Sequence, residues 1–404
     1  MSDDLNPMVN AGSPYGAPGD EPTQKAINPK RRFQIAIIAV ALVVVAGSAF
    51  AYTVGSVIAP SVEVYNAYSS LAKESSLNTN VSLNVSAQGL AKVFNLSDSQ
   101  VADAKIRNVK NLNDLSVVIN KISVNVQSQK TSNNLPKVKA GIQYGGLDLF
   151  GFGLIDRTLY LDTDAFKIAT NDPTAPFTAE QVNGLPDLYT NYVQSLGVQP
   201  SSDDAVIVDD LRNMVAGTPL SYTFTEGTSA GDAFDKVFKV SSAAPSSTLT
   251  AEQKALEHSF GNAMFQSSTL VKNGSDTNGD RIDVTINMSQ VYKLMQVDFD
   301  AYAKDPAKYP DLSKLKSDLD GFSSLGEGQA KKLKVSLWIK DKQFSQIRVY
   351  LANLSSQASV STLSDSDLYL QMTFSHNAQV IAPQSARSLN TLIDKLMGHP
   401  IVSL

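Results

Sequence analysis

The pattern of apolar and polar residues divides the chain into a short polar start, one long uncharged run, and a much longer region of alternating and helical segments. Residues 33–59, FQIAIIAVALVVVAGSAFAYTVGSVIA, contain no charged side chain. About 20 apolar helical residues span a bilayer, so this run predicts a transmembrane helix. Residues 1–32 are rich in Gly, Pro and polar residues without apolar periodicity, which predicts a disordered tail.

Charges beside the uncharged run predict its orientation. Lys30, Arg31 and Arg32 immediately precede it, and the next charge after it is Glu63. Basic residues favour the cytoplasmic side, so we expect a cytoplasmic N-terminus and an extracytoplasmic region after the span. A second interpretation is a cleaved signal, because Ala49-Phe50-Ala51 matches a cleavage site that would end the leader at Ala51.

Beyond the span, residues 60–77 place Val64, Tyr68 and Leu71 at helical spacing, which predicts a membrane-proximal helix. Residues 78–404 then form the predicted extracytoplasmic domain, with a possible division into 78–219 and 220–404. Alternating segments predict strands at 80–86, 115–127, 137–163, 332–338, 344–354 and 368–374. Two similar strand–turn–strand units, at 221–242 and 268–289, each predict a further hairpin followed by a helix, and their shared layout suggests an internal duplication or the same unit used twice. Helical spacing predicts helices at 97–110, 178–196, 203–215, 249–264, 289–303, 312–322 and 383–397.

Strands in antiparallel runs with helices between the runs are typical of the α+β class. The expected architecture is a curved, antiparallel, half-barrel-like sheet with packed helices. In segment 115–127 the apolar positions change parity between Ile119 and Ile122, which we interpret as a bulge.

Composition excludes several classes of function. The chain of 404 residues has a net charge of −5 and no basic cluster away from the predicted span, so nucleic-acid binding is unsupported. It has no cysteine, which removes disulfides, thiolate nucleophiles, cysteine-based zinc sites and a lipid-attachment cysteine.

Two short motifs partly match known functional sites, a catalytic serine and a calcium-binding loop, but neither match is complete. Residues 227–231, GTSAG, match the nucleophile elbow around Ser229, but residues 236–242 alternate like the return strand of a hairpin, where an elbow needs a helix. Asp276, Asn278 and Asp280 resemble half of a calcium loop, yet Arg281 stands where that loop needs glycine. We therefore expect no enzyme activity, no metal site and no cofactor.

The hairpin sequence KVSLWIKDKQFSQIRVYL, together with the preceding span and strand–helix units, resembles the LolA/LppX-like lipoprotein-carrier superfamily. That resemblance implies a half-barrel that wraps helices and holds lipid or lipoprotein acyl chains. Many exported relatives carry a lipid-attachment cysteine that this chain lacks.

Two functions follow as expectations. In the first, a membrane-anchored extracytoplasmic protein binds a lipid or other amphiphile in a groove of the sheet. The candidate groove residues are inward-facing apolar and aromatic side chains: Tyr144, Leu149, Phe152, Tyr160, Trp338, Phe344 and Tyr350. In the second, the domain has a filled core, binds no ligand, and serves as a cell-envelope interaction module with an envelope protein as its partner.

Overall fold

The computed structural model describes residues 59–131, 135, 137–197, 199–242, 251–309, 332–351 and 363–389. The tail and the predicted transmembrane residues 33–58 lie outside this part of the chain. Among the helices that are described, none combines the length and apolarity that crossing a membrane requires.

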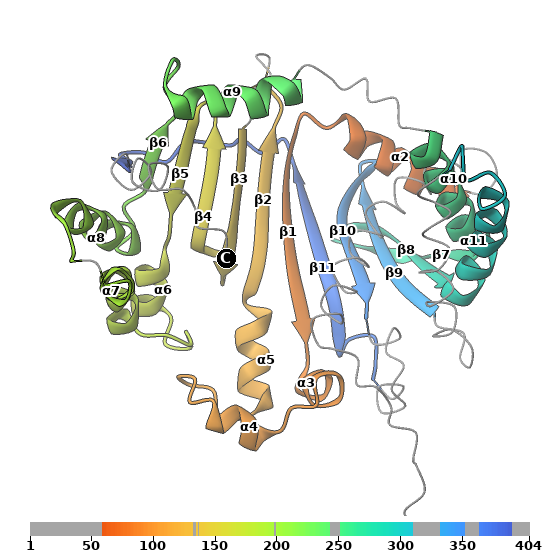
Figure 1. Cartoon of the computed structure of the whole chain (residues 1–404). Helices are drawn as coiled ribbons and strands as arrows, with labels where there is room; N and C mark the ends of the chain where they lie inside the picture. Colours follow the sequence, from red (N-terminus) through yellow and green to blue (C-terminus); the bar gives the residue numbers. More distant parts are fainter. Residues whose placement is uncertain are drawn as a thin grey trace, which may run out of the picture. The chain divides into compact units, whose positions relative to one another are not determined.

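All described strands belong to one sheet, whose order is β12-β6-β5-β4-β3-β2-β1-β11-β10-β9-β8-β7 (Figure 1). The strands are β1 (Ser76–Val85), β2 (Ile122–Gln129), β3 (Lys137–Tyr144), β4 (Leu147–Ile155), β5 (Thr158–Asp162), β6 (Leu220–Thr223), β7 (Ser268–Asp276), β8 (Gly279–Asn287), β9 (Lys332–Lys340), β10 (Gln343–Tyr350), β11 (Leu368–His376) and β12 (Arg387–Ser388). Every pairing is antiparallel except that of β12 with β6. This open sheet with its helices confirms the α+β class, whereas the half-barrel curvature stays a prediction.

The sheet consists of two meanders that meet at its centre. Strands β1 to β6 follow one another in the first meander, β7 to β11 in the second, and β1 pairs with β11 over nine residue pairs. Residues on both sides of position 219 thus belong to one continuous sheet, and β6 continues the first meander.

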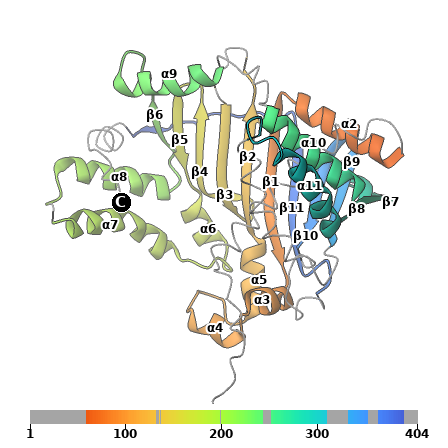
Figure 2. The same cartoon turned by 45° about the vertical axis from the view of Figure 1, so that its right-hand side comes forward.

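The helices are α2 (Ala59–Lys73), α3 (Ala87–Phe94), α4 (Asp98–Asp103), α5 (Leu112–Asn120), α6 (Ala165–Asn171), α7 (Ala179–Ser195), α8 (Ser202–Val215), α9 (Ser229–Ser242), α10 (Ala251–Gln266) and α11 (Met288–Tyr302). Helix α2 contacts β7, β9 and β10, and α11 contacts α10 and β8. At the other end of the sheet, α6 contacts β4 and α7, while α8 contacts α7 and β5. Figure 2 shows α2, α10 and α11 beside the second meander and α6, α7 and α8 beside the first.

Residue pairing assigns each side chain to one of two faces, because opposed residues point to the same side and neighbours along a strand point to opposite sides. One face is apolar: Val81 pairs with Met372 and with Val124, and Ile347 with Leu337. We call it the apolar face and the opposite one the polar face. Under α2 and α11 the apolar face is buried, with Ile282, Val284 and Leu337 less than a tenth exposed.

Several predicted elements are confirmed. The helices at 178–196, 203–215 and 249–264 form as α7, α8 and α10, and Pro186 lies inside α7 without dividing it. The meander at 137–163 turns at Gly145 and Gly146, and the hairpin of β9 and β10 turns at Asp341 and Lys342, whose positive φ angles suit two-residue hairpin turns.

Other predictions were wrong. Residues 112–120 form helix α5, so the parity change near Ile119 marks a helix-to-strand boundary and no bulge. Residues 229–242 form helix α9 where a return strand was predicted, which removes the proposed repeat of one strand–turn–strand unit. The described part of the predicted helix at 383–397 contains the short strand β12. The helix predicted at 312–322 lies outside the described residues.

Candidate functional site

The first meander leaves large apolar side chains exposed on the apolar face. They lie on three adjacent strands and are 38 to 46% exposed: Ile122, Val124 and Val126 on β2, Ile142 on β3, and Phe150 and Phe152 on β4. We call these six residues the β2–β4 patch. Single exposed apolar residues are common in soluble proteins, whereas a contiguous group on one face usually marks an interaction site.

The register shows that the patch is contiguous. Val124 pairs with Ile142, which in turn pairs with Phe150, so these three side chains form one row across the strands. Val126 and Phe152 flank Ala140 in the next row. Neighbouring strands lie about 5 Å apart, so each row continues over roughly 10 Å of apolar surface.

The opposite face of the same strands is occupied by its own polar network. Lys139 lies 2.8 Å from Asp148 and 3.1 Å from Asp162, and Gln143 donates to Asp148 at 2.9 Å. Asn80 donates to Gln143 and thereby extends the network to β1. Burial alone would lower the pKa of Lys139, but its hydrogen bond to Asp148 and the two carboxylate charges outweigh burial and raise that pKa.

Glycines allow this network to lie close against the sheet. Gly151 points to the polar face, and a Cβ atom there would come within 2.4 Å of Asp162 Oδ1. The alternation Phe150-Gly151-Phe152-Gly153 therefore places aromatic rings on one face and space for the carboxylates on the other. In β2, β3 and β4 the side chains of the polar face therefore bond to one another, whereas the apolar side chains of the other face are exposed.

Helices close one end of the patch. Tyr144 ends β3 on the apolar face, is 2% exposed, and packs in a cluster with Val118 of α5 and Ile168 of α6. Its hydroxyl donates to the Thr174 carbonyl at 3.2 Å, and burial raises its pKa. Figures 1 and 2 show α5 at this end of the strands and α9 crossing near the other end of β3 to β5.

A salt bridge stands beside this helical end. Lys121 Nζ lies 2.7 Å from Asp172 Oδ2 and 5.4 Å from the centre of the Tyr144 ring. Hydrogen bonds from Lys121 and then Thr174 lower the pKa of Asp172 to about 2. The pair fixes the loop after α6 to the start of β2.

The seven groove candidates do not share one face. Phe152 belongs to the patch, and Tyr144 lies buried at its end. Leu149 packs between the clusters around α5, α6 and α7. Phe344 opposes Ile339 in the second meander and is 5% exposed, so it is core beneath the helices there.

The other three candidates lie on the polar face. Tyr160 opposes Gly153, so it points away from Phe152. Trp338 is 3% exposed, lies between the guanidinium groups of Arg281 and Arg348 at 5.3 and 5.1 Å, and donates through Nε1 to Asp276 at 2.7 Å. Tyr350 is buried, with its hydroxyl 3.0 Å from the Ser336 hydroxyl.

Sequence reasoning did not select five of the six patch residues. Their alternation was visible on β2, but exposure depends on which part of the sheet the helices cover. The local signal was the Phe-Gly-Phe-Gly run of β4, because alternating glycines leave one face of a strand without side chains.

The two chemical motifs differ from expectation in different ways. Ser229 is the first residue of helix α9, so the return strand that was predicted at 236–242, and that argued against an elbow, is wrong. Two other observations still argue against an elbow. The nucleophile of an elbow has a strained backbone, whereas Ser229 is not among the described residues with positive φ. The strand before it, β6, pairs antiparallel with β5, whereas an elbow lies on a parallel sheet.

At the β7–β8 turn, Asp276 accepts hydrogen bonds from Asn278 and Trp338, and both Lys272 and Ser275 donate to Asp280. In the described part of the chain, no group of three or more His, Asp or Glu residues is placed to hold a metal ion.

Comparisons with known proteins give little support for a family. No family model matches the chain. No curated protein matches it significantly. Among solved structures, the crystal structure of the Mycobacterium tuberculosis lipoprotein LppX matches 79% of this chain and 97% of that chain, with 8% identity and a TM-score of 0.26. This is a weak resemblance at the level of the fold, and it carries no argument about ligand or function.

Proposed function

We propose that the chain is a membrane-anchored extracytoplasmic binding protein that holds a lipid or another amphiphile against the β2–β4 patch. The observation that carries the proposal is the exposure of six large apolar side chains on one sheet face, five of them in two adjacent rows. The uncharged run at 33–59 and its basic flank support the anchor and the orientation. The function proposed is binding, without catalysis.

The energetics favour an apolar ligand over a polar one. Covering apolar surface gains about 25 cal/mol for each Å², and the patch offers aliphatic and aromatic carbon without a charged member. The polar side chains on the other face already form hydrogen bonds and salt bridges with one another, so they have fewer free groups for binding a ligand. An acyl chain or another extended hydrocarbon fits rows that run across three strands.

The test is to purify the full chain in a mild detergent and examine it by native mass spectrometry and by solvent extraction for copurified lipid. An apolar fluorescent dye then reports whether a saturable site exists. We expect a bound lipid or saturable dye binding that lipid displaces. Absence of both refutes the proposal.

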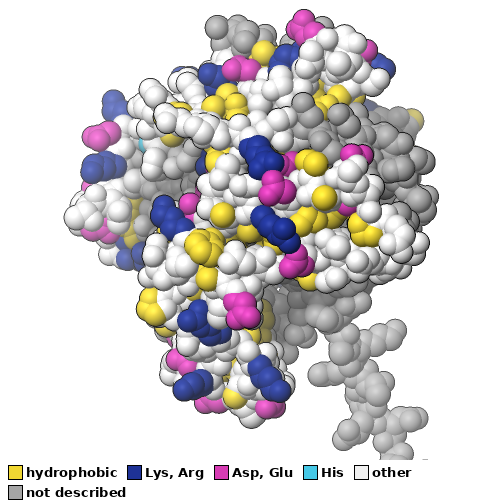
Figure 3. Space-filling model, turned by 90° about the vertical axis from the view of Figure 1, so that its left-hand side faces the viewer, with side chains coloured by type: hydrophobic (Ala, Val, Ile, Leu, Met, Phe, Trp, Pro, Cys, Tyr) yellow, Lys and Arg dark blue, Asp and Glu magenta, His cyan; other side chains and the backbone are white. Residues whose placement is uncertain are grey.

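A second candidate, the interaction module, is favoured by one observation on α7. Five apolar residues recur at helical spacing along α7 and its C-cap, but only the first of them is buried: Val182, Leu185, Leu188, Tyr192 and Leu196. The other four are 48 to 61% exposed, a longer apolar stripe than a solvated helix needs. Figure 3, which views the side on which α8 lies, shows hydrophobic side chains between charged ones.

The two candidates predict different effects of changing this stripe. Replacement of Leu188 and Tyr192 by Ser leaves lipid or dye binding unchanged if the β2–β4 patch is the site. If the chain is an interaction module, the same replacement reduces capture of its envelope partner by chemical cross-linking in cells, and no lipid copurifies with the unmodified chain.

A further inference from the structure

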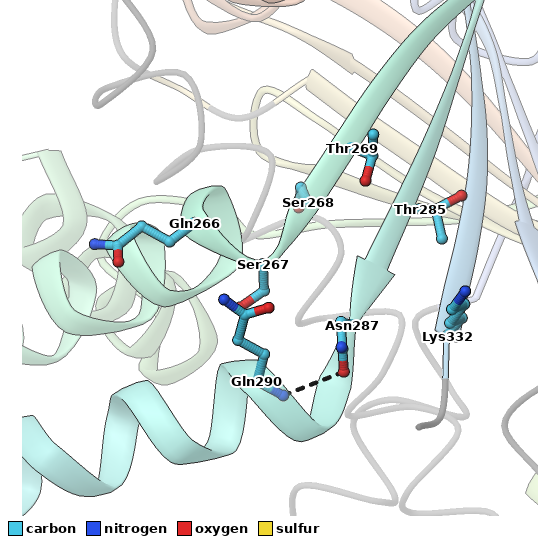
Figure 4. Close-up of a pocket in the computed structure, with 8 residues that line it drawn as sticks. All are labelled: Gln266, Ser267, Ser268, Thr269, Thr285, Asn287, Gln290 and Lys332. Atoms are coloured by element: carbon cyan, nitrogen blue, oxygen red, sulfur yellow. Dashed lines mark hydrogen bonds between the residues drawn. The ribbon is translucent and has the colours of Figure 1, made fainter. Parts of the chain in front are cut away.

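A polar pocket lies at one end of the second meander, where β7, β8 and β9 meet helices α10 and α11 (Figure 4). Its volume is about 260 Å³, and it is open to one side. The eight described residues that line it are Gln266, Ser267, Ser268, Thr269, Thr285, Asn287, Gln290 and Lys332. The β2–β4 patch lies on the other meander and the other face, so this pocket is a separate site.

The register explains why these side chains gather. Thr269 opposes Thr285 and Asn287 opposes Lys332, so all four point to the polar face. The Asn287 backbone donates to the Ser267 carbonyl at 2.8 Å, which brings the end of α10 to the start of α11. Figure 4 shows the Gln290 side chain rising from the first turn of α11 toward Ser267.

The lining has the chemistry of an anion site. Lys332 is the only charged side chain among the eight, and the others are hydroxyls and amides, all of which can donate hydrogen bonds to oxygen. No carboxylate is among them, which disfavours a cation. Ammonium and hydroxyl donors bind carboxylate or phosphate oxygens with short, charge-assisted hydrogen bonds.

Helix α11 adds a second favourable term. It begins at this pocket, has 15 residues, and is capped by Asn287, whose side chain accepts from the Gln290 backbone at 3.2 Å. The N-terminal end of a helix carries partial positive charge and unpaired N–H groups, so it attracts anions.

A buried hydroxyl gives independent evidence of a missing partner. Ser267 lines the pocket and is 6% exposed, yet its buried Oγ atom makes no hydrogen bond within the described part of the chain. A buried hydroxyl without a partner costs free energy, and such groups in native proteins are usually paired with protein, water or a ligand.

The charged side chains next to the pocket on these strands are paired with one another outside its lining. On the polar face, Lys334 follows Lys332 by two residues and pairs with Asp365 at 2.8 Å. Asp283, two residues before Thr285, bonds to Arg281 and Ser336. Lys332 thus supplies the positive charge of the pocket lining itself.

From these observations we infer that this pocket binds a small anionic oxygen group, a phosphate or a carboxylate, between Lys332, Ser267 and the start of α11. The inference goes beyond the proposed apolar ligand and does not depend on it. A phosphate could be free or belong to a lipid headgroup, and the experiment below separates these sources.

The test titrates the full chain with inorganic phosphate and with acetate at constant ionic strength, by calorimetry or by shifts of backbone amide NMR signals. We expect saturable binding of at least one anion. Lys332→Gln should weaken it roughly 10-fold or more, because it removes a charge-assisted hydrogen bond. Lys340→Gln is the matched control, since Lys340 is the exposed last residue of the same strand.

Ser267→Ala separates a ligand contact from a structural role. Removing an unpaired buried hydroxyl should leave the thermal unfolding midpoint of the unliganded protein unchanged or raised, while weakening anion binding by about twofold to tenfold. The inference is overturned if wild type and Lys332→Gln bind equally well, or if phosphate, acetate and the short-chain phosphatidic acid described next all fail to bind saturably.

A water-soluble short-chain phosphatidic acid completes the design. If it alone binds and Lys332→Gln does not weaken it, the ligand is held elsewhere and the pocket inference fails, while the proposed function stands. If Phe150→Ser with Phe152→Ser abolishes its binding but inorganic phosphate still binds, the pocket inference stands independently.

Discussion

The sharpest test of the proposed function replaces Phe150 and Phe152 together by Ser. An aromatic side chain presents roughly 200 Å² of surface, and these two are 43 and 45% exposed, which leaves about 90 Å² on each ring for a ligand to cover. At about 25 cal/mol per Å² this is worth about 2 kcal/mol per ring when coverage is complete.

A ligand that covers half of that exposed area gains about 2 kcal/mol from the two rings, so the double variant should weaken binding roughly 30-fold. The assay is displacement of an apolar dye, with Kd measured for wild type and variant. Because part of each ring is buried, the variant also loses folding stability, and urea unfolding must show that it remains folded under the assay conditions.

The matched control is Tyr160→Ser. Tyr160 lies on the adjacent strand β5, is partly buried, and opposes Gly153, so it faces away from the patch. Its replacement should cost comparable stability and leave the dye Kd unchanged. Unchanged dye binding by the folded Phe150/Phe152 variant, or equal weakening by Tyr160→Ser, refutes the assignment of the ligand to this face.

Three further predictions concern charge. Lys139→Met leaves the carboxylates of Asp148 and Asp162 next to each other without a cation, so urea unfolding at pH 7 should show a loss of about 1–3 kcal/mol in the free energy of unfolding. Because the pKa of Lys139 is raised above 10.5, the stability advantage of the wild type holds below that pH and disappears as the pH rises further. Equal stability of wild type and variant at pH 7 would contradict the network. The pKa of Asp172 is lowered from 3.8 to about 2, so its ionised form stabilises the fold above that window; wild type should lose up to about 1 kcal/mol as the pH falls through it, and Asp172→Asn should lack that decline. Protease added to intact cells should digest the region after the predicted span and leave an N-terminal tag protected, with acidic replacement of residues 30–32 scrambling this result; a protected outer region in the unmodified protein would make the predicted orientation wrong.

The sequence predicted elements whose signals are local. The β3–β4 and β9–β10 hairpins combine period-two alternation with turn residues such as Gly145-Gly146, and both the alternation and the turn act within a few residues. Helix α7 likewise begins at Thr178, whose side chain and that of Gln181 form a reciprocal cap.

The errors arose where two periods fit the same residues. Residues 112–120 are rich in Val, Ile and Leu, which favours a strand, but Asn111 caps a helix by accepting from the Asp114 backbone at 3.0 Å. In α9, Ala230 and Phe234 lie four residues apart and are both buried, a helical spacing that the alternation after residue 235 concealed.

The site was harder to predict than the fold, because alternation indicates two faces without indicating which of them a distant helix covers. Val124 and Leu337 both occupy the apolar face, yet Val124 is 46% exposed and Leu337 only 8%. The difference comes from α2, which precedes β1 in the chain but packs on β7, β9 and β10 of the second meander. The pairing of β1 with β11 makes this possible, because it brings β1, which directly follows α2, beside a strand whose residues come almost 300 positions later. The same connection joins the second meander, whose apolar face helices cover, to the first meander, whose β2–β4 patch is exposed. The proposed ligand would therefore cover the patch of the first meander without disrupting the packing of the second.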